Sequence, residues 1–156
     1  GAEGAHQIKL VFLGDVSEAV KDSLAENGLL GSCRFEGYVP KKNLTGFVNS
    51  TSLLLLCEGD DRSYEFAVPG KLYEYLSMKA PLLAIGPKQW EVAQLVTDLE
   101  ETLVVTHEQK DVMKQFVKAL LDQFMPTKLP LRTARSVERF EHQALCQQLA
   151  TRIKAL

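Results

Sequence analysis

The segments LLLLC at residues 53–57 and PLLAI at residues 81–85 decide the fold class. Each is an unbroken apolar run of strand length, without the alternation expected of a strand that has one face in water. Strands of this kind are covered on both faces, as in a parallel sheet whose crossover helices pack on its two sides. The two runs therefore predict an α/β protein built on a parallel sheet.

Strand-like and helix-like segments alternate along the rest of the chain. Further strands are predicted at 8–13, 33–39 and 102–105, and helices at 17–24, 42–49, 71–79, 89–95, 109–124 and 134–155. This order predicts a Rossmann-like, doubly wound parallel sheet of about five to six strands with helices on both faces. In such sheets ligands bind at the carboxyl ends of the strands, which directs attention to the loops that follow them.

The composition excludes several classes of protein. With 46% hydrophobic and 24% charged residues, the chain matches an ordinary globular protein, and its net charge of -2 argues against nucleic-acid binding. Cys33, Cys57 and Cys146 are an odd, widely spaced set, which predicts reduced core thiols in a cytoplasmic protein. No apolar run approaches the roughly 20 residues that span a membrane. Residues 1–7 are expected to be a tag or linker, and residues 8–156 one domain.

A candidate site lies where the charged loop at 58–68 leads into the helix predicted at 71–79. A helix that begins after Pro69 and Gly70 offers unpaired backbone N–H groups and a partial positive charge, and Lys71 adds a full charge. Glu74 projects from the same face one turn further on, where a carboxylate can accept hydrogen bonds from ribose hydroxyls. The pattern predicts a nucleotide site, although an exposed charge pair on a helix surface has the same spacing.

The longer segment VPGKLYEYLSMKAPLLA at 68–84 resembles the donor-site signature of family-4 glycosyltransferases (glycosyl transferases group 1) with the GT-B fold. FEGYV at 35–39 is similar to their strand and loop that contact the base, and ERF at 138–140 to the start of their last helix. The resemblance implies that residues 8–156 are the C-terminal, nucleotide-sugar-binding half of such an enzyme. It assigns the ribose to Glu74, the diphosphate to Lys71 and the backbone at Pro69, Gly70 and Leu72, and the base to residues around Phe35 and Tyr38.

The chain also departs from the family pattern. Many members carry a Glu eight positions before the ribose Glu, where this sequence has Phe66. Either Glu65, one residue away, takes that sugar-facing role, or the first acid is lost, as the sequence favours. Because residues 8–13 resemble the second strand of the family's domain, its first strand, with the Arg and Lys that follow it in the family, is expected to be missing from this chain. Lys79-Ala80 stands where most members have Gly before the proline, and residues 97–101 replace a glycine-rich acidic loop.

The resemblance implies an enzyme, a hexosyltransferase-like glycosyltransferase of polysaccharide biosynthesis. It would move a sugar from a nucleoside diphosphate sugar to a glycan or lipid-linked acceptor, with retention of anomeric configuration. A missing N-terminal acceptor-binding domain would complete it, so this half alone is expected to be inactive, and no catalytic residue is assigned. No cofactor or metal is expected. The full enzyme is expected in the cytoplasm, with peripheral association at the inner face of the membrane as a further expectation.

Two other functions use the same kind of fold. A phospho-receiver or similar signalling module on a flavodoxin-like sheet needs paired acids after the first strand and an aspartate after the third, where this chain has Asp15 alone and Cys57. A further alternative is that the chain is half of a sugar-nucleotide epimerase, which has the same fold. Asp15 is expected to cap the helix at 17–24. The remaining candidates are expected to be solvated surface or without assigned chemistry: Glu58, Asp60, Asp61, His6, His107 and His142.

Overall fold

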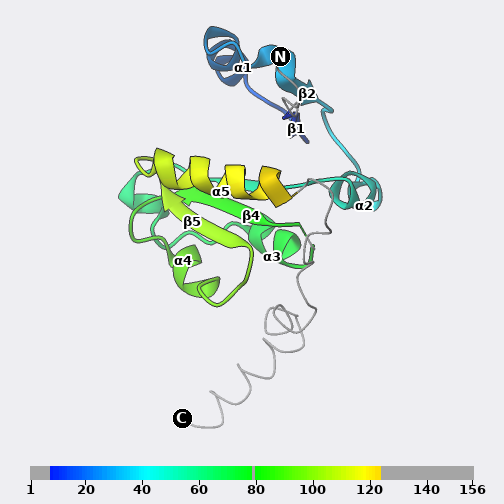
Figure 1. Cartoon of the computed structure of the whole chain (residues 1–156). Coiled ribbons are helices and arrows are strands. Elements are labelled where there is room, and N and C mark those ends of the chain that lie inside the picture. Colours follow the sequence, from blue (N-terminus) through cyan, green and yellow to red (C-terminus); the bar gives the residue numbers. More distant parts are fainter. Residues whose placement is uncertain (1–7, 79, 124–156) are drawn as a thin grey trace, which may run out of the picture. The chain divides into compact units, whose positions relative to one another are not determined.

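The computed structural model describes residues 8–78 and 80–123, within two compact units, Gly1–Phe47 and Val48–Leu156. In the described ranges five strands and five α-helices alternate, and all strand pairing is parallel (Figure 1). The predicted α/β class is confirmed. The strands form a two-stranded and a three-stranded sheet, however, where the sequence predicts one sheet of five to six. The helix predicted at 134–155, with Cys146 and the ERF segment, lies outside the described residues.

In the first unit, β1 (Leu10–Phe12) pairs with β2 (Cys33–Phe35) after a crossover through α1 (Glu18–Glu26) and the short 3-10 helix η1 (Leu30–Ser32). Phe12 lies in register with Phe35, and their rings stack with centroids 5.1 Å apart. Helix α1 ends two residues later than predicted, with Asn27 as its C-cap, and Gly28 after it takes a φ of 68° that favours glycine.

The two strands of this unit are shorter than predicted because the backbone turns at a glycine on each. Gly14, with φ 108°, donates its amide hydrogen to the carbonyl of Gly37, with φ 63°, across 2.6 Å. The prediction that Asp15 caps the following helix is wrong. The N-cap of α1 is Ser17, whose carbonyl accepts the first amides of the helix, and no side chain caps it. Helix α2 (Lys41–Asn49) then carries the chain into the second unit.

The second unit contains a sheet in the order β3-β4-β5, formed by Leu54–Cys57, Leu82–Gly86 and Thr102–Thr106. Leu54 is in register with Leu82, and Leu82 with Thr102. The central strand β4 is buried on both faces, as its unbroken apolar sequence predicts. The edge strand β3 is buried on one face only, because Leu54 and Leu56 are covered and Leu55 and Cys57 are not.

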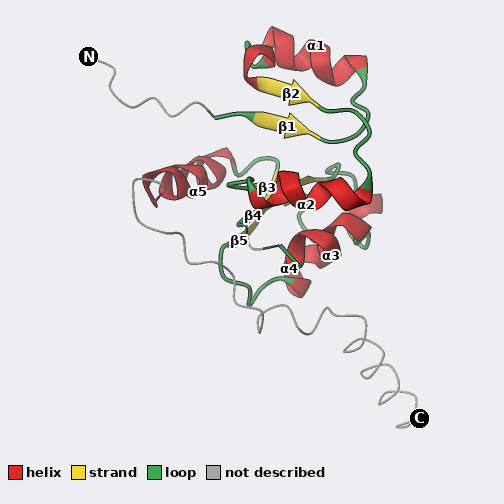
Figure 2. Ribbon diagram, turned by 90° about the vertical axis from the view of Figure 1, so that its right-hand side faces the viewer, coloured by secondary structure: helices red, strands yellow, loops and turns green. Residues whose placement is uncertain are grey.

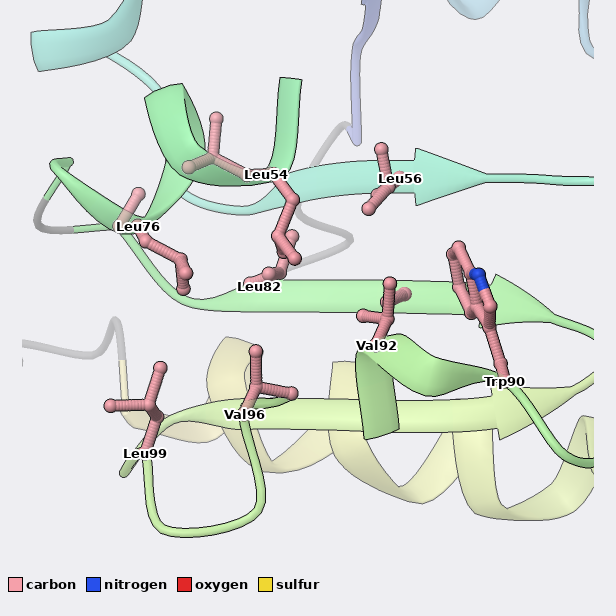
Figure 3. Packing of buried hydrophobic residues seen from close by; sticks show 11 residues of the cluster. Leu54, Leu56, Leu76, Leu82, Trp90, Val92, Val96 and Leu99 are labelled. Atoms are coloured by element: carbon pink, nitrogen blue, oxygen red, sulfur yellow. The ribbon is translucent and has the colours of Figure 1, made fainter. Parts of the chain in front are cut away.

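Helices lie on both faces of this sheet. Helices α3 (Gly70–Leu76) and α4 (Glu91–Leu95) lie on one side, and α5 (Lys110–Gln123) on the other (Figures 1 and 2). The side chains between the sheet and helices α3 and α4 make one cluster (Figure 3). Its members include Leu54, Leu56, Leu82 and Ala84 from the strands, and Leu72, Leu76, Trp90 and Val92 from α3 and the start of α4. This cluster fixes α3 and α4 against the sheet.

Candidate functional site

The N-terminus of α3 stands at the carboxyl edge of the three-stranded sheet. The chain leaves β3 at Cys57, passes through the loop at 58–69 and returns along the sheet as α3 to reach the start of β4. In parallel α/β sheets this edge is where ligands bind. The helix begins one residue earlier than predicted, at Gly70, with Pro69 as an extended N-cap, and no side chain caps it.

The first amides of α3 are of two kinds. The Leu72 amide donates to the carbonyl of Pro69 at 2.9 Å and is therefore engaged within the protein. The amides of Gly70 and Lys71 precede any intrahelical acceptor, as in every helix. Apart from the two neighbouring residues and the backbone of the helix itself, no heavy atom lies within 4 Å of the position that a Cβ on Gly70 would occupy. Of the three predicted phosphate-binding amides, that of Leu72 is therefore engaged within the protein, whereas those of Gly70 and Lys71 have no acceptor within the helix.

The side chains of α3 divide between core and solvent. Leu72 and Leu76 are fully buried, whereas Lys71 and Glu74 are exposed. Leu72 therefore anchors the helix, and the two charged residues predicted for the donor remain accessible. Tyr75 is half-buried on the same helix, and its phenol pKa is raised, first by burial and then by the Glu74 carboxylate and Cys57. A raised pKa keeps this phenol neutral at physiological pH.

The loop at 58–69 is held by hydrogen bonds along its length. Asp61 accepts the Ser63 amide at 2.8 Å and starts the 3-10 helix η2 (Arg62–Tyr64), and hydrogen bonds from Ser63 lower the pKa of its carboxyl. At the start of the loop, the Glu58 carbonyl lies 2.8 Å from Nε2 of His107, which donates in the tautomer that carries its proton there. His107, which the sequence leaves without a role, therefore tethers the loop to the end of β5.

Glu65 and Phe66 point in different directions. The Glu65 side chain is 13% exposed, and its Oε1 lies 3.9 Å from Nε of Arg62. Phe66 is 82% exposed. The Phe66 ring is therefore exposed to solvent, whereas the neighbouring Glu65 side chain is largely covered by the rest of the protein.

Trp90 is a residue of this site that the sequence analysis missed. It is 1% exposed, and its indole N–H donates to the carbonyl of Ala67 at 2.7 Å. Its ring lies over Gly86 at the end of β4, where an added Cβ would come within 2.4 Å of it. The one signal in the sequence is that this is the sole tryptophan of the chain. Nothing in the spacing indicates a contact to a residue so distant along the chain.

The residues predicted for the base belong to the first unit. Phe35 is half-buried, stacked on Phe12 with Lys21 Nζ 5.8 Å from its ring centroid, so its ring is engaged within that unit. Tyr38 follows Gly37 beyond the end of β2 and is exposed. The predicted donor residues are thus found in two groups, Phe35 with Tyr38 in the first unit and Glu65 with Pro69 to Glu74 in the second.

The prediction of buried core thiols is wrong for Cys57. Its side chain is on the uncovered face of the edge strand, and the residue is exposed, whereas Cys33 is half-buried and donates to the Leu29 carbonyl at 3.3 Å. Local burial of the Cys57 thiol, followed by the Glu58 carboxylate, raises its pKa. The thiol is therefore protonated at neutral pH and is a poor nucleophile.

Within 8–78 and 80–123, no group of three or more His, Cys, Asp or Glu side chains is arranged to hold a metal ion. No helix in these ranges is both long and apolar enough to cross a bilayer.

Comparisons of the chain with family models, with curated proteins and with solved structures find no match. The features that bear on function are the geometry around α3 and the resemblance of residues 68–84 to the family signature.

Proposed function

We propose that this chain is the donor-binding half of a retaining glycosyltransferase, which moves a sugar from a nucleoside diphosphate sugar to a glycan or lipid-linked acceptor. The observation that best supports this function is the division of α3 into two faces. Leu72 and Leu76 bury one face, while Lys71 and Glu74 remain exposed beside an uncapped N-terminus. The segment at 68–84, which resembles the family signature, is the one that carries this arrangement.

Each exposed group of α3 matches one part of the donor. The diphosphate accepts hydrogen bonds from the amides of Gly70 and Lys71 and faces the Lys71 ammonium, where the helix terminus favours negative charge. The Glu74 carboxylate accepts from the ribose hydroxyls one turn further on. The resemblance alone assigns the base to the region of Phe35 and Tyr38.

This half of the enzyme contributes position and charge to the reaction. As the bond between the sugar and the diphosphate breaks, negative charge grows on the departing phosphate, and preorganised donors at the helix terminus stabilise it. The acceptor and the remaining catalytic groups come from an N-terminal domain, and the full enzyme acts in the cytoplasm, associated peripherally with the membrane. The chain alone therefore binds nucleotide without turning it over.

The fold that belongs to this function is half of a GT-B enzyme, a doubly wound sheet of five to six strands. The unpaired outer edge of β3 and the exposure of its Leu55 side chain support the larger sheet. The amides of Leu54 and Glu58 donate to Pro81 and Ile85 beside β4, so the alternation of a strand directs the amides of Leu55 and Cys57 toward its other edge. Leu55 is 45% exposed, although strands of a doubly wound sheet are covered on both faces.

Amide hydrogen exchange followed by NMR tests the larger sheet. If a further strand pairs along the outer edge of β3, the amides of Leu55 and Cys57 exchange as slowly as those of Leu54 and Glu58, which serve as internal references. If β3 is a true edge, the two outward amides exchange at least about a hundredfold faster than the references, because an amide bonded to water has no opening step to wait for. The second outcome would restrict the sheet to three strands.

Substitution of Glu74 tests the donor site. A charge-assisted hydrogen bond contributes about 1.5–3 kcal/mol, so Glu74→Ala is expected to weaken the binding of nucleoside diphosphates by about tenfold to a hundredfold. Isothermal titration with UDP, GDP and ADP measures this and identifies the base. Glu100→Ala is the matched control, because Glu100 is an exposed glutamate of the same unit and belongs to the segment before β5. Equal affinities for the Glu74 variant and the wild type would remove the ribose contact from the proposal.

A further inference from the structure

The first unit has an apolar surface and no buried core. Among the residues from 8 to 47 whose burial the structure describes, none is buried. The exposed large hydrophobic residues of this unit are Ile8, Val11, Leu13, Val20, Leu29, Leu30 and Tyr38. A two-stranded sheet by itself is marginally stable at best in water, and parallel strands are ordinarily covered on both faces. The sheet of this unit therefore offers surface for a partner to cover.

Strand β1 has one covered face and one open face. The Phe12 ring stacks on Phe35, and Lys21 Nζ of α1 lies 5.8 Å from the Phe35 ring centroid, so α1 covers the face that carries both rings. Side chains alternate along a strand. Val11 and Leu13 accordingly lie on the opposite face, where they are 48% and 38% exposed. The open face of β1 is therefore apolar.

The outer edge of β1 is also open. The Glu36 amide donates to the Phe12 carbonyl at 3.0 Å, so Phe12 directs its backbone groups toward β2. The alternation of a strand then directs the N–H and C=O groups of Val11 and Leu13 away from β2. In the described part of the chain, no strand pairs with β1 on that side.

The outer side of β2 has a different character. Its exposed Arg34 forms an ion pair with Glu36 just beyond the strand. Charged side chains protect the edge of a sheet from pairing. Strand β1, from Leu10 to Phe12, carries no charge along its length. Of the two edges of this sheet, that of β1 is the one suited to receive a further strand.

We infer that the outer edge of β1 is the interface for a second copy of this chain, in which the two β1 strands pair antiparallel about a twofold axis. A twofold interface presents the same surface from both copies, and it is the commonest kind among oligomers. The inference goes beyond the proposed function. The pairing strand contains none of the residues assigned to the donor, so the two stand or fall separately.

The pattern of side chains selects one register, with Phe12 opposite Phe12 of the second copy. Val11 is then opposite Leu13 of the second copy, and both direct their backbone groups outward, as a hydrogen-bonded antiparallel pair requires. Two such pairs bring four apolar side chains together on the open face. The exposed Lys9 is opposite the exposed Asp15 of the second copy, so opposite charges meet at both ends of the paired segment.

Other registers fit less well. A shift of one residue sets outward backbone groups opposite inward ones, which breaks the ladder. A shift of two residues sets Lys9 opposite Leu13, or Asp15 opposite Val11, so a charge faces an apolar side chain. Because one strand edge and four apolar side chains make a small interface, we expect a weak dimer whose population rises with concentration.

A charge exchange tests the interface. Sedimentation equilibrium of the complete chain over a concentration series gives the dissociation constant of the dimer. Lys9→Glu and Asp15→Lys, each alone, set like charges opposite each other at both ends of the pair, and each is expected to weaken the dimer by about tenfold. The double variant restores opposite charges and is expected to return to within about threefold of the wild type. Lys88→Glu, the same change at an exposed lysine of the second unit, is the matched control and is expected to have no effect.

Amide hydrogen exchange tests which edge pairs. Exchange at Val11 and Leu13 is expected to slow as the protein concentration rises, because their amides become bonded in the dimer. The amide of Leu55, on the outer edge of β3, is expected to exchange at a rate independent of concentration. Slowing at Leu55 without slowing at Val11 would place the dimer at β3 and overturn the inference.

Two further results would overturn it. One is a chain that stays monomeric at millimolar concentration. The other is a dimer that both single charge variants leave unchanged, or that the double variant fails to restore, because such a dimer uses another surface. Neither result bears on nucleotide binding, which the Glu74→Ala titration judges by itself.

Discussion

Replacement of Trp90 by alanine is expected to lower the free energy of unfolding by about 3–5 kcal/mol. The indole is buried within the main cluster beside Val92, and it also satisfies the carbonyl of Ala67. The alanine variant leaves both a cavity and an unpaired carbonyl in the loop. Because single domains are stable by only about 5–15 kcal/mol, this loss removes a large part of the total stability. Urea denaturation followed by circular dichroism measures it.

Trp90→Phe is the matched control for the cavity. It keeps most of the packing and removes the hydrogen bond, so the expected loss falls to about 1–3 kcal/mol. If the alanine variant lost less than 1 kcal/mol, Trp90 would not be the centre of the packing between β4 and α4.

Replacement of Gly86 by alanine is expected to cost about 3 kcal/mol, at the upper end of the range for an overpacked core. Three atoms of the Trp90 ring lie 2.4, 2.7 and 2.8 Å from the position of the added Cβ. The ring is held in place by its hydrogen bond and cannot move away freely. The same urea titration measures the effect.

Gly70→Ala provides the control for the glycine substitution. No heavy atom surrounds the added methyl group there, and the residue starts a helix, where alanine is favoured over glycine by up to about 1 kcal/mol. This variant is expected to be as stable as the wild type or slightly more stable. Equal stability of the two glycine variants would show that the contact with Trp90 is not tight.

The fold class was predictable because it depends on local pattern. Continuous apolar sequence gave the buried strand β4, and a Pro-Gly pair located the start of α3 to within one residue. Pairing of strands is not a local property, so the sequence did not reveal that the strands form two sheets. Cys57 was misjudged for the same reason, since an apolar run does not distinguish a central strand from an edge strand whose second face is open. Asp15 was misjudged because α1 begins only at Glu18, so that Ser17 occupies the N-cap position, and no side chain caps the helix.

The candidate site was predictable only in its linear part. Lys71 and Glu74 follow from helical spacing, and the structure leaves both exposed. The engagement of the Leu72 amide by Pro69 depends on how tightly the first turn closes, which side-chain pattern does not encode. The contacts that hold the loop, from Trp90 to Ala67 and from His107 to Glu58, join residues 23 and 49 positions apart. Contacts at that separation are set by the packing of β4 and β5.

The most direct test of the donor site is an NMR titration of the complete chain with UDP, GDP and ADP, each with its sugar conjugate. The proposed function predicts that at least one nucleotide shifts the amide signals of Gly70, Lys71 and Glu74 most strongly, and that these shifts weaken in Glu74→Ala. Absence of any shift at millimolar nucleotide, or shifts confined to α5 and the start of β5, would contradict it and leave Lys71 and Glu74 as ordinary surface charges.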